Sequence, residues 1–265
     1  MYPLAYLAKA IAGDNADVIT LVPPGTEPHD YELTPKQVAS LGTAAVVVYQ
    51  AGVSAAIDEA IAEAAPSDTV ETGGLIQLLP PPVGDDDPAT TYGYDPHTWL
   101  DPANMIVFAD AITAAMALAD PPHASQYRDA DATTKTQLTG LDNEYRDTLV
   151  GCQRSTFLTT HAAFGYLAQA YGLTQLAIAG VTPEDEPSPR RLGMLAKQAR
   201  TLGLTTVFFE TLVSPDYANT LAADLDLRTD VLDPIEAVTK SSRGDDYMAI
   251  MRSNLNALRT ANGCP

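Results

Sequence analysis

The feature that most constrains the fold is a stretch of unbroken helical character in the middle of the chain. Between Ala124 and Val150 there is no proline and a single glycine, Gly140. An apolar stripe at helical spacing runs along its second half: Leu138, Leu141, Tyr145 and Leu149. A helix of roughly 25 residues is about 40 Å long, which is long for packing within one small domain. We therefore expect this helix to act as a strut between two lobes.

The regions on either side of this stretch alternate short apolar runs with helical patterns. Strands are expected at 17–22, 44–49, 68–71, 155–160, 175–179, 205–210 and 229–233, with helices at 1–12, 53–65, 102–119, 162–171, 189–202, 215–224 and 245–261. A further helix is expected to begin at Pro35, because Thr34 is a typical capping residue and proline favours the first helical turn. Such alternation is typical of α/β proteins with parallel sheets. The predicted fold has two parallel-sheet lobes, residues 1–120 and 151–265, joined by one long rigid helix within 121–150.

The charge balance excludes several kinds of partner. The 265 residues include 15 Lys and Arg against 34 Asp and Glu, a formal net charge of −19. A surface this acidic repels phosphate backbones and anionic lipids, so neither nucleic acid nor a membrane surface is an expected partner. No run approaches ~18–20 uninterrupted apolar residues, so no transmembrane helix is expected. Residues 1–12 contain no basic segment or cleavage signature of a signal peptide.

Only four histidines are present, and three of them lie where predicted strands end or helices begin. His29 follows the strand at 17–22, His97 precedes the helix at 102, and His161 directly follows the strand at 155–160. Two carboxylates, Glu210 and Asp233, also stand at strand ends. Ligands of open α/β sheets bind at the carboxyl ends of the strands, so these side chains can converge on one cleft. Three imidazoles and a carboxylate suit a borderline cation such as Zn²⁺.

Other readings stay open at this point. The spacing of the histidines matches no short metal motif, so each could be a hydrogen-bonded loop residue. His123, at the start of the long helix, is expected to be a surface or capping residue. The HExxH, GxSxG, P-loop and GxGxxG motifs are all absent. Cys152 and Cys264 fit no redox or zinc-finger spacing, and either two free thiols or one disulfide is compatible with them.

The sequences around the three histidines resemble those of a known family. Segments with this resemblance are PGTEPHDYELTP around His29, DPHTWLDP around His97, THAAFGYL around His161, IAG and EPSP at 178–189, FFE at 208–210 and VLDP at 231–234. They are similar, in order along nearly the whole chain, to the metal-binding solute-binding proteins of zinc and manganese ABC importers, the ZnuA/TroA-like family.

The resemblance implies a metal held in a cleft between the two lobes. Carried over residue by residue, it gives His29, His97, His161 and Asp233 as ligands, with Glu210 as a ligand or as the partner that orients one. Manganese-type relatives usually have Glu at the third position, so His161 favours zinc, in agreement with the softer character of a third imidazole.

The resemblance has three further implications. An extracytoplasmic family favours a disulfide between Cys152 and Cys264 that ties the ends of the second lobe. Relatives usually have a strand before the segment that corresponds to Tyr2, so that strand and any signal segment are expected to lie outside the residues given. The zinc-type relatives often carry a His-rich loop before the second ligand, whereas this chain has Asp85, Asp86 and Asp87, expected to form a solvated loop.

These observations predict an extracytoplasmic, monomeric zinc-binding protein, periplasmic or anchored at the cell surface, that delivers Zn²⁺ to an ABC transporter permease and has no catalytic activity. A manganese receptor of the same class is the first alternative. The second is a zinc hydrolase with an open coordination position and Glu210 or Glu27 as general base. The third is a surface adhesin in which the metal is structural.

Overall fold

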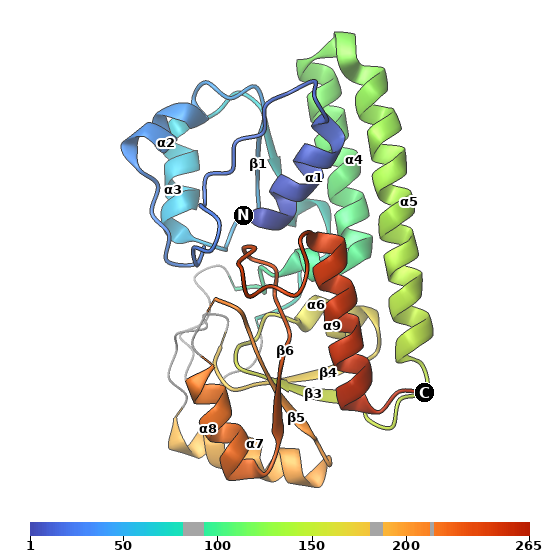
Figure 1. Ribbon diagram of the computed structural model, residues 1–265. Coiled ribbons are helices and arrows are strands. Elements are labelled where there is room, and N and C mark those ends of the chain that lie inside the picture. Colours follow the sequence, from blue (N-terminus) through green and yellow to red (C-terminus); the bar gives the residue numbers. More distant parts are fainter. Residues whose placement is uncertain (82–92, 181–187, 213–214) are drawn as a thin grey trace.

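The structure, a computed structural model, describes residues 1–81, 93–180, 188–212 and 215–265. It is a mixed α/β protein with two parallel sheets, as predicted from the sequence (Figure 1). The first half contains α1 (Tyr2–Ala12), α2 (Pro35–Leu41), β1 (Val47–Tyr49), α3 (Ala55–Ala64), β2 (Thr69–Glu71) and α4 (Pro102–Ala119), followed by α5 (Ala124–Leu149). The second half contains β3 (Thr156–Thr159), α6 (Gly165–Ala170), β4 (Thr174–Ala177), α7 (Pro189–Thr201), β5 (Thr206–Phe209), α8 (Asp216–Leu225), β6 (Arg228–Val231) and α9 (Tyr247–Asn262).

Three helices begin where a capping side chain precedes a proline. The Thr34 hydroxyl accepts the N–H of Gln37 at the start of α2, in a reciprocal capping box. Asp101 accepts the N–H of Ala103 at the start of α4, and Ser188 accepts the N–H of Arg191 at the start of α7. Proline costs nothing at the first helical position because the N–H it lacks has no partner in the helix. The sequence pattern therefore located these three helix starts correctly.

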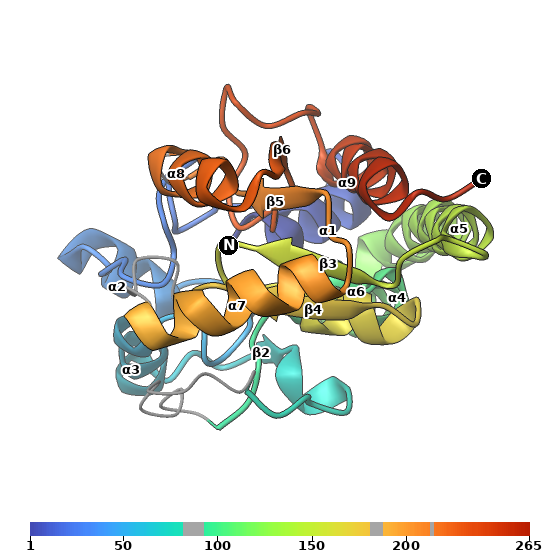
Figure 2. The same cartoon turned by 90° about the horizontal axis from the view of Figure 1, so that it is seen from below.

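The second half is built on a four-stranded parallel sheet in the order β4-β3-β5-β6. One face packs on α7 and α8 through a cluster that includes Leu158, Val207 and Leu195; these two helices lie in front of the sheet in Figure 2. The other face carries Phe157 and Phe208 into the main core, with α6 and α9. Because all four strands run the same way, their carboxyl ends open on one edge, where the loops to 161, 210 and 233 begin.

The first half has a much smaller sheet, in which β1 pairs only with β2. The expected strand at 17–22 does not form, and the expected strand at 44–49 is shortened to Val47–Tyr49. An apolar cavity of about 400 Å³ separates residues 16–22 from residues 43–50 and is closed on one side by α1. An extended segment needs a hydrogen-bonded neighbour to become a strand, and across this cavity residues 17–22 have none. The expected buried strand at 17–22 is therefore wrong, because the pairing that a strand requires is missing.

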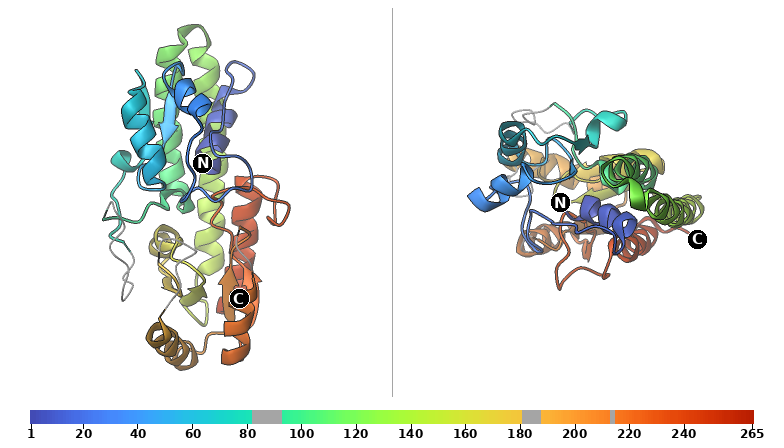
Figure 3. Two further views of the ribbon diagram at one scale, coloured as in Figure 1. Left: turned by 90° about the vertical axis from the view of Figure 1, so that its left-hand side faces the viewer. Right: turned by 90° about the horizontal axis from the view of Figure 1, so that it is seen from above.

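The long helix α5 runs beside both halves of the molecule (Figures 1 and 3). It packs against α1 and α4 in the first half and against α9 in the second. Tyr145 is fully buried and donates to the carbonyl of Met251 on α9 at 2.6 Å. One continuous hydrophobic cluster extends from Leu7 and Phe108 to Tyr145 and Leu258, so α5 contributes to the core over most of its length.

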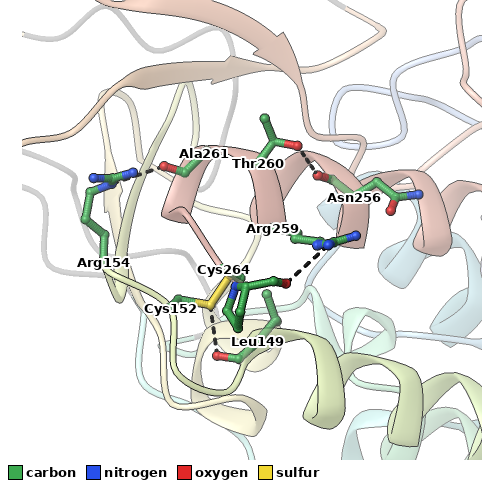
Figure 4. Close-up of a disulfide and its surroundings, with 9 residues drawn as sticks. Leu149, Cys152, Arg154, Asn256, Arg259, Thr260, Ala261 and Cys264 are labelled. Carbon is green, nitrogen blue, oxygen red and sulfur yellow. Dashed lines mark hydrogen bonds between the residues drawn. A yellow bond between two sulfur atoms is a disulfide. The ribbon is translucent and has the colours of Figure 1, made fainter.

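A disulfide closes the second half, the pairing that the resemblance implied. Cys152 and Cys264 are bonded, with a sequence separation of 112 residues (Figure 4). The chain on either side of the bond is also held together, because Arg154 donates from its backbone to the Asn262 carbonyl at 3.1 Å and from its side chain to that of Ala261 at 3.1 Å. The bond therefore ties the residues that precede β3 to the end of α9.

Helix α4 is an exception to the expectation that no helix is long and apolar enough to span a membrane. Among the described residues, Pro102–Ala119 is long and apolar enough to do so by length and composition alone, a test that core helices of soluble proteins also pass. It packs against α1 and α5, and Asp110 on it pairs with Lys135 of α5. A charged pair in the middle of the helix, together with the fully buried Phe108 and Ile112, fits a core helix better than a lipid-exposed one.

Candidate metal centre

Three of the four histidines meet at one point, from loops that are far apart in the sequence. His29 lies in the loop before α2, His97 just before the short helical turn Thr98–Leu100, and His161 directly after β3. The ring centroids of His29 and His97 are 5.4 Å apart, and those of His97 and His161 are 5.5 Å apart. The convergence agrees with the expectation from the sequence, although among the described residues only His161 of the three closely follows a strand.

The fourth group at this point is Glu236. Its Oε1 lies 3.4 Å from Nε2 of His29, 3.1 Å from Nε2 of His97 and 3.7 Å from Nε2 of His161. The Glu236 side chain is completely buried. Its loop follows β6, so four segments of the chain, two from each side of α5, contribute to the cluster.

The distances from Glu236 Oε1 to the three imidazole nitrogens fit a tetrahedral cation site, and ligand atoms of His29, His97 and Glu236 also lie within 4.8 Å of one another. Ligands about 2.0–2.1 Å from zinc are separated by edges of roughly 3.3 Å in a regular tetrahedron, and the three nitrogen-to-oxygen distances of 3.1–3.7 Å bracket that value. The Nε2 atoms of His29 and His161 are buried without a hydrogen-bond partner. Buried polar atoms are rarely left so, and a bound cation would satisfy both.

A hydrogen bond to the opposite ring nitrogen orients each imidazole. Nδ1 of His29 lies 2.9 Å from the carbonyl of Val53, which can only accept, so this nitrogen carries the proton. Nδ1 of His97 is 2.8 Å from Asp95 Oδ1, and Nδ1 of His161 is 2.6 Å from Glu210 Oε1. Such partners fix the tautomer and leave the Nε2 lone pair available to a metal. Glu210 thus occupies the orienting position that the sequence analysis allowed for it.

The electrostatics of the cluster favour positive charge. Burial opposes the charged form of His97, but its bonds to Asp95 and Glu236 raise its pKa overall. The pKa of His161 is raised well above the usual value, because Glu210 and Glu236 outweigh the same burial penalty. Desolvation opposes the charged form of Glu236, but the three neighbouring imidazoles outweigh it and hold the pKa of Glu236 well below its usual range. A divalent cation satisfies the same demand.

A further, half-buried carboxylate, that of Glu27, lies beside the cluster. One oxygen each of Glu27, Glu210 and Glu236 can be chosen so that all lie within 4.8 Å of one another. Burial, and then the charge of Glu236, raise the pKa of Glu27 to about 8. Glu27 also accepts the backbone N–H of His29 at 3.2 Å, so it helps to hold the loop that carries this histidine.

The carboxylate of Asp233, which the resemblance implied as a ligand, is bonded to other groups in the structure. Its Oδ1 accepts the N–H of Ile235 at 2.8 Å, and its Oδ2 accepts the hydroxyl of Thr211 at 3.1 Å. The carboxylate that reaches the histidines is Glu236, three residues further along. The sequence contains a signal for it, because VLDPIE offers two carboxylates after one strand.

The remaining sequence expectations lie away from the cluster. His123 is bonded to Asp120 on the surface, at 2.7 Å, next to the start of α5. This agrees with its expected role as a surface or capping residue. Asp85, Asp86 and Asp87 lie outside the residues that the structure describes.

The fold and the cluster define a metal-binding solute-binding protein. The family described as "Zinc-uptake complex component A periplasmic" matches residues 1–261. The chain therefore belongs to this family, which is one of solute-binding proteins, not of enzymes.

Individual relatives agree with this assignment. The zinc-binding protein AdcA of Streptococcus pyogenes is 32% identical over 97% of this chain and 54% of its own length. The high-affinity zinc uptake system protein ZnuA of Bacillus subtilis is 32% identical over 97% of this chain and 84% of its own length. The chain thus spans about half the length of the AdcA proteins it matches.

A solved structure shows the same fold. The Zn(II)-bound ZnuA-like domain of Streptococcus pneumoniae AdcA superposes with a TM-score of 0.83, at 32% identity, over 98% of this chain and 96% of that one.

Proposed function

We propose that this protein captures Zn²⁺ outside the cytoplasm and delivers it to the membrane permease of an ABC importer. Its family and the names of its relatives, which include zinc-binding and zinc-uptake proteins, support this function. The observation that carries the proposal is the cluster itself. One carboxylate oxygen lies 3.1–3.7 Å from three Nε2 atoms, and each imidazole is oriented by a partner of its own.

We assign His29, His97, His161 and Glu236 as the zinc ligands. This set replaces the one containing Asp233, whose two carboxylate oxygens are engaged by Ile235 and Thr211. Four protein ligands fill a tetrahedral zinc site and leave no position for an activated water. This closed arrangement suits binding and transport, and it gives a hydrolase no site for its reaction.

The donor set favours zinc over manganese. Three imidazoles suit zinc, whereas Mn²⁺ prefers more oxygen ligands and a higher coordination number. The four side chains are also buried, which leaves little space for the water molecules that complete an octahedral shell. Burial therefore favours the lower coordination number of zinc.

Release of zinc requires that some of its four ligands move away from it. We propose that residues 1–120 and 151–265 act as two lobes around the metal, with residues 121–150 as the connection. His29 and His97 come from the first lobe, so a small shift of their loops removes two ligands at once. The protein would work as a monomer, either free in a periplasm or anchored at the cell surface, as the lipoprotein name of a pneumococcal relative suggests for that protein.

A competition titration tests the proposal. Metal-free protein is titrated with Zn²⁺ and with Mn²⁺ against a chromophoric chelator, and the bound metal is then counted by elemental analysis. We expect one tightly bound zinc per chain and much weaker binding of manganese. Equal affinities would favour the manganese receptor, and the absence of tight zinc binding would refute the assignment.

A further inference from the structure

The short segment between β6 and Glu236 has an unusual backbone. Among the described residues only Ala65, Asp226 and Ile235 combine a side chain with a positive φ. Ala65 and Asp226 end helices α3 and α8, where the left-handed conformation is common. Ile235, with φ of 62°, ends no helix. A β-branched residue is rarely found in this conformation, and such strain persists only where the surroundings impose it.

Several hydrogen bonds impose it here. Asp233 Oδ1 accepts the N–H of Ile235 at 2.8 Å, which closes a tight turn over Pro234. Asn254 on α9 bonds both the N–H and the carbonyl of Asp233, at 2.9 and 2.7 Å. The indole of Trp99 donates to the Pro234 carbonyl at 2.7 Å. The turn is thus held from α9 on one side and from the segment after His97 on the other.

This turn determines where Glu236 points. The φ of Ile235 sets the direction in which the chain enters the next residue, and an ordinary negative φ would turn it elsewhere. Glu236 is 1% exposed and its Oε1 lies within 3.7 Å of all three Nε2 atoms, so there is no room for a loosely directed side chain.

We propose that Asp233 is a positioning residue for Glu236. Its Oδ1 holds the Ile235 N–H in the left-handed turn, and this aims the Glu236 carboxylate at the three imidazoles. What the turn requires of residue 233 is an acceptor oxygen at that position, which an amide supplies as well as a carboxylate. The inference rests on the proposed function, in which Glu236 is a zinc ligand.

The test is a double-mutant cycle on zinc affinity, measured by chelator competition. Asp233→Asn keeps the acceptor oxygen and should stay within about threefold of the unmodified protein. Asp233→Ala loses it and should bind zinc at least about tenfold more weakly, an effect expected of a lost outer partner. In a Glu236→Gln background the same Asp233→Ala change should have an effect of less than about twofold, because the group it positions no longer binds zinc as a carboxylate.

Asp233→Glu covers the case in which the alanine variant does not fold. It keeps the negative charge but displaces the oxygen by one methylene, so it should bind zinc more weakly than Asp233→Asn. The reverse order, or a loss in Asp233→Asn as large as in Asp233→Ala, would show that the charge of Asp233 acts directly on the metal. An undiminished Asp233→Ala effect in the Glu236→Gln background would also overturn the proposal.

The proposed function fails in a distinguishable way. If the unmodified protein does not bind zinc, or if Glu236→Gln alone leaves zinc affinity unchanged, the ligand assignment is wrong whatever the Asp233 variants do.

Discussion

The two halves of the molecule support the metal cluster in different ways. In the second half, His161, Glu210 and the segment with Glu236 follow three adjacent strands of a four-stranded sheet, and a disulfide closes that half. In the first half, His29 and His97 lie on loops beside a two-stranded sheet with an apolar cavity next to it. The comparison indicates a firmly held part of the site in the second half and a more adjustable part in the first.

Removal of a ligand from the firmly held part should have the largest effect. His161→Ala should weaken zinc binding by more than roughly 100-fold, beyond the 10–100-fold loss typical of an outer partner, because the buried neighbours cannot supply another nitrogen. Chelator competition measures the affinity, and circular dichroism of the metal-free variant checks that the fold is kept. His123→Ala is the matched control and should leave zinc affinity unchanged. A His161→Ala variant with full affinity would refute the assignment.

Loss of the disulfide should act on stability and spare the site. Cys152→Ser with Cys264→Ser should lower the free energy of unfolding by about 2–5 kcal/mol, as for other native disulfides. Zinc affinity at moderate temperature should change little, because no ligand lies beside the bond. Urea denaturation measures the first effect and competition titration the second. A thiol assay on denatured, unreduced protein should find no free thiol, and two thiols would contradict the pairing.

A contact between the two halves, Gly165 with Asp95, can be changed to weaken zinc binding less than the loss of a ligand does. A methyl group added at Gly165, at the start of α6, would lie 2.5 Å from Asp95 Oδ2. Gly165→Ala should therefore push Asp95 away from Nδ1 of His97 and reduce zinc affinity by about tenfold, in the range of a lost outer partner. Gly140→Ala, on α5 where the added carbon meets nothing within 4 Å, is the control. Equal affinities for the two variants would show that the first half adapts to the change without loss.

Acidification should separate metal binding from stability. The pKa values of His97 and His161 are raised in the folded protein, so their stabilisation is present below the usual histidine value of about 6.5 and is lost as the pH rises through the raised values. The pKa of Glu27 is raised to about 8, so its ionisation also lowers the stability of the folded protein as the pH rises. The metal-free protein should therefore have a higher Tm at pH 6 than at pH 8.5.

Zinc binding should show the opposite dependence. His97 and His161, whose pKa values are raised, must lose the proton on Nε2 to bind zinc, so the rise in Tm caused by zinc should be smaller at pH 6 than at pH 8.5. Scanning calorimetry with and without zinc gives both quantities. If both Tm values fell together on acidification, the raised histidine pKa values would be contradicted.

The clustering of three histidines could be predicted from the sequence, whereas the presence of Glu236 beside them could not. The four histidines are few and easily located, and three of them lie next to the ends of predicted strands or the starts of predicted helices. The choice between Asp233 and Glu236 depends on the positive φ of Ile235, which a β-branched residue gives no reason to expect. It is imposed by Trp99 and Asn254, which are distant in the sequence.

The same contrast applies to the fold. Helix starts such as Thr34-Pro35 were predictable because capping is local. The apolar pattern at 17–22 also reads as a strand, yet whether it pairs depends on a neighbour that no local pattern supplies.

A crystal structure of the zinc-loaded protein would show whether three imidazoles and Glu236 bind zinc. Anomalous scattering at the zinc edge would locate the ion. We expect one zinc about 2.0–2.1 Å from Nε2 of His29, His97 and His161 and at a similar distance from a Glu236 oxygen, with Asp233 still bonded to Ile235. A zinc bound by Asp233, or by water in place of Glu236, would contradict this expectation.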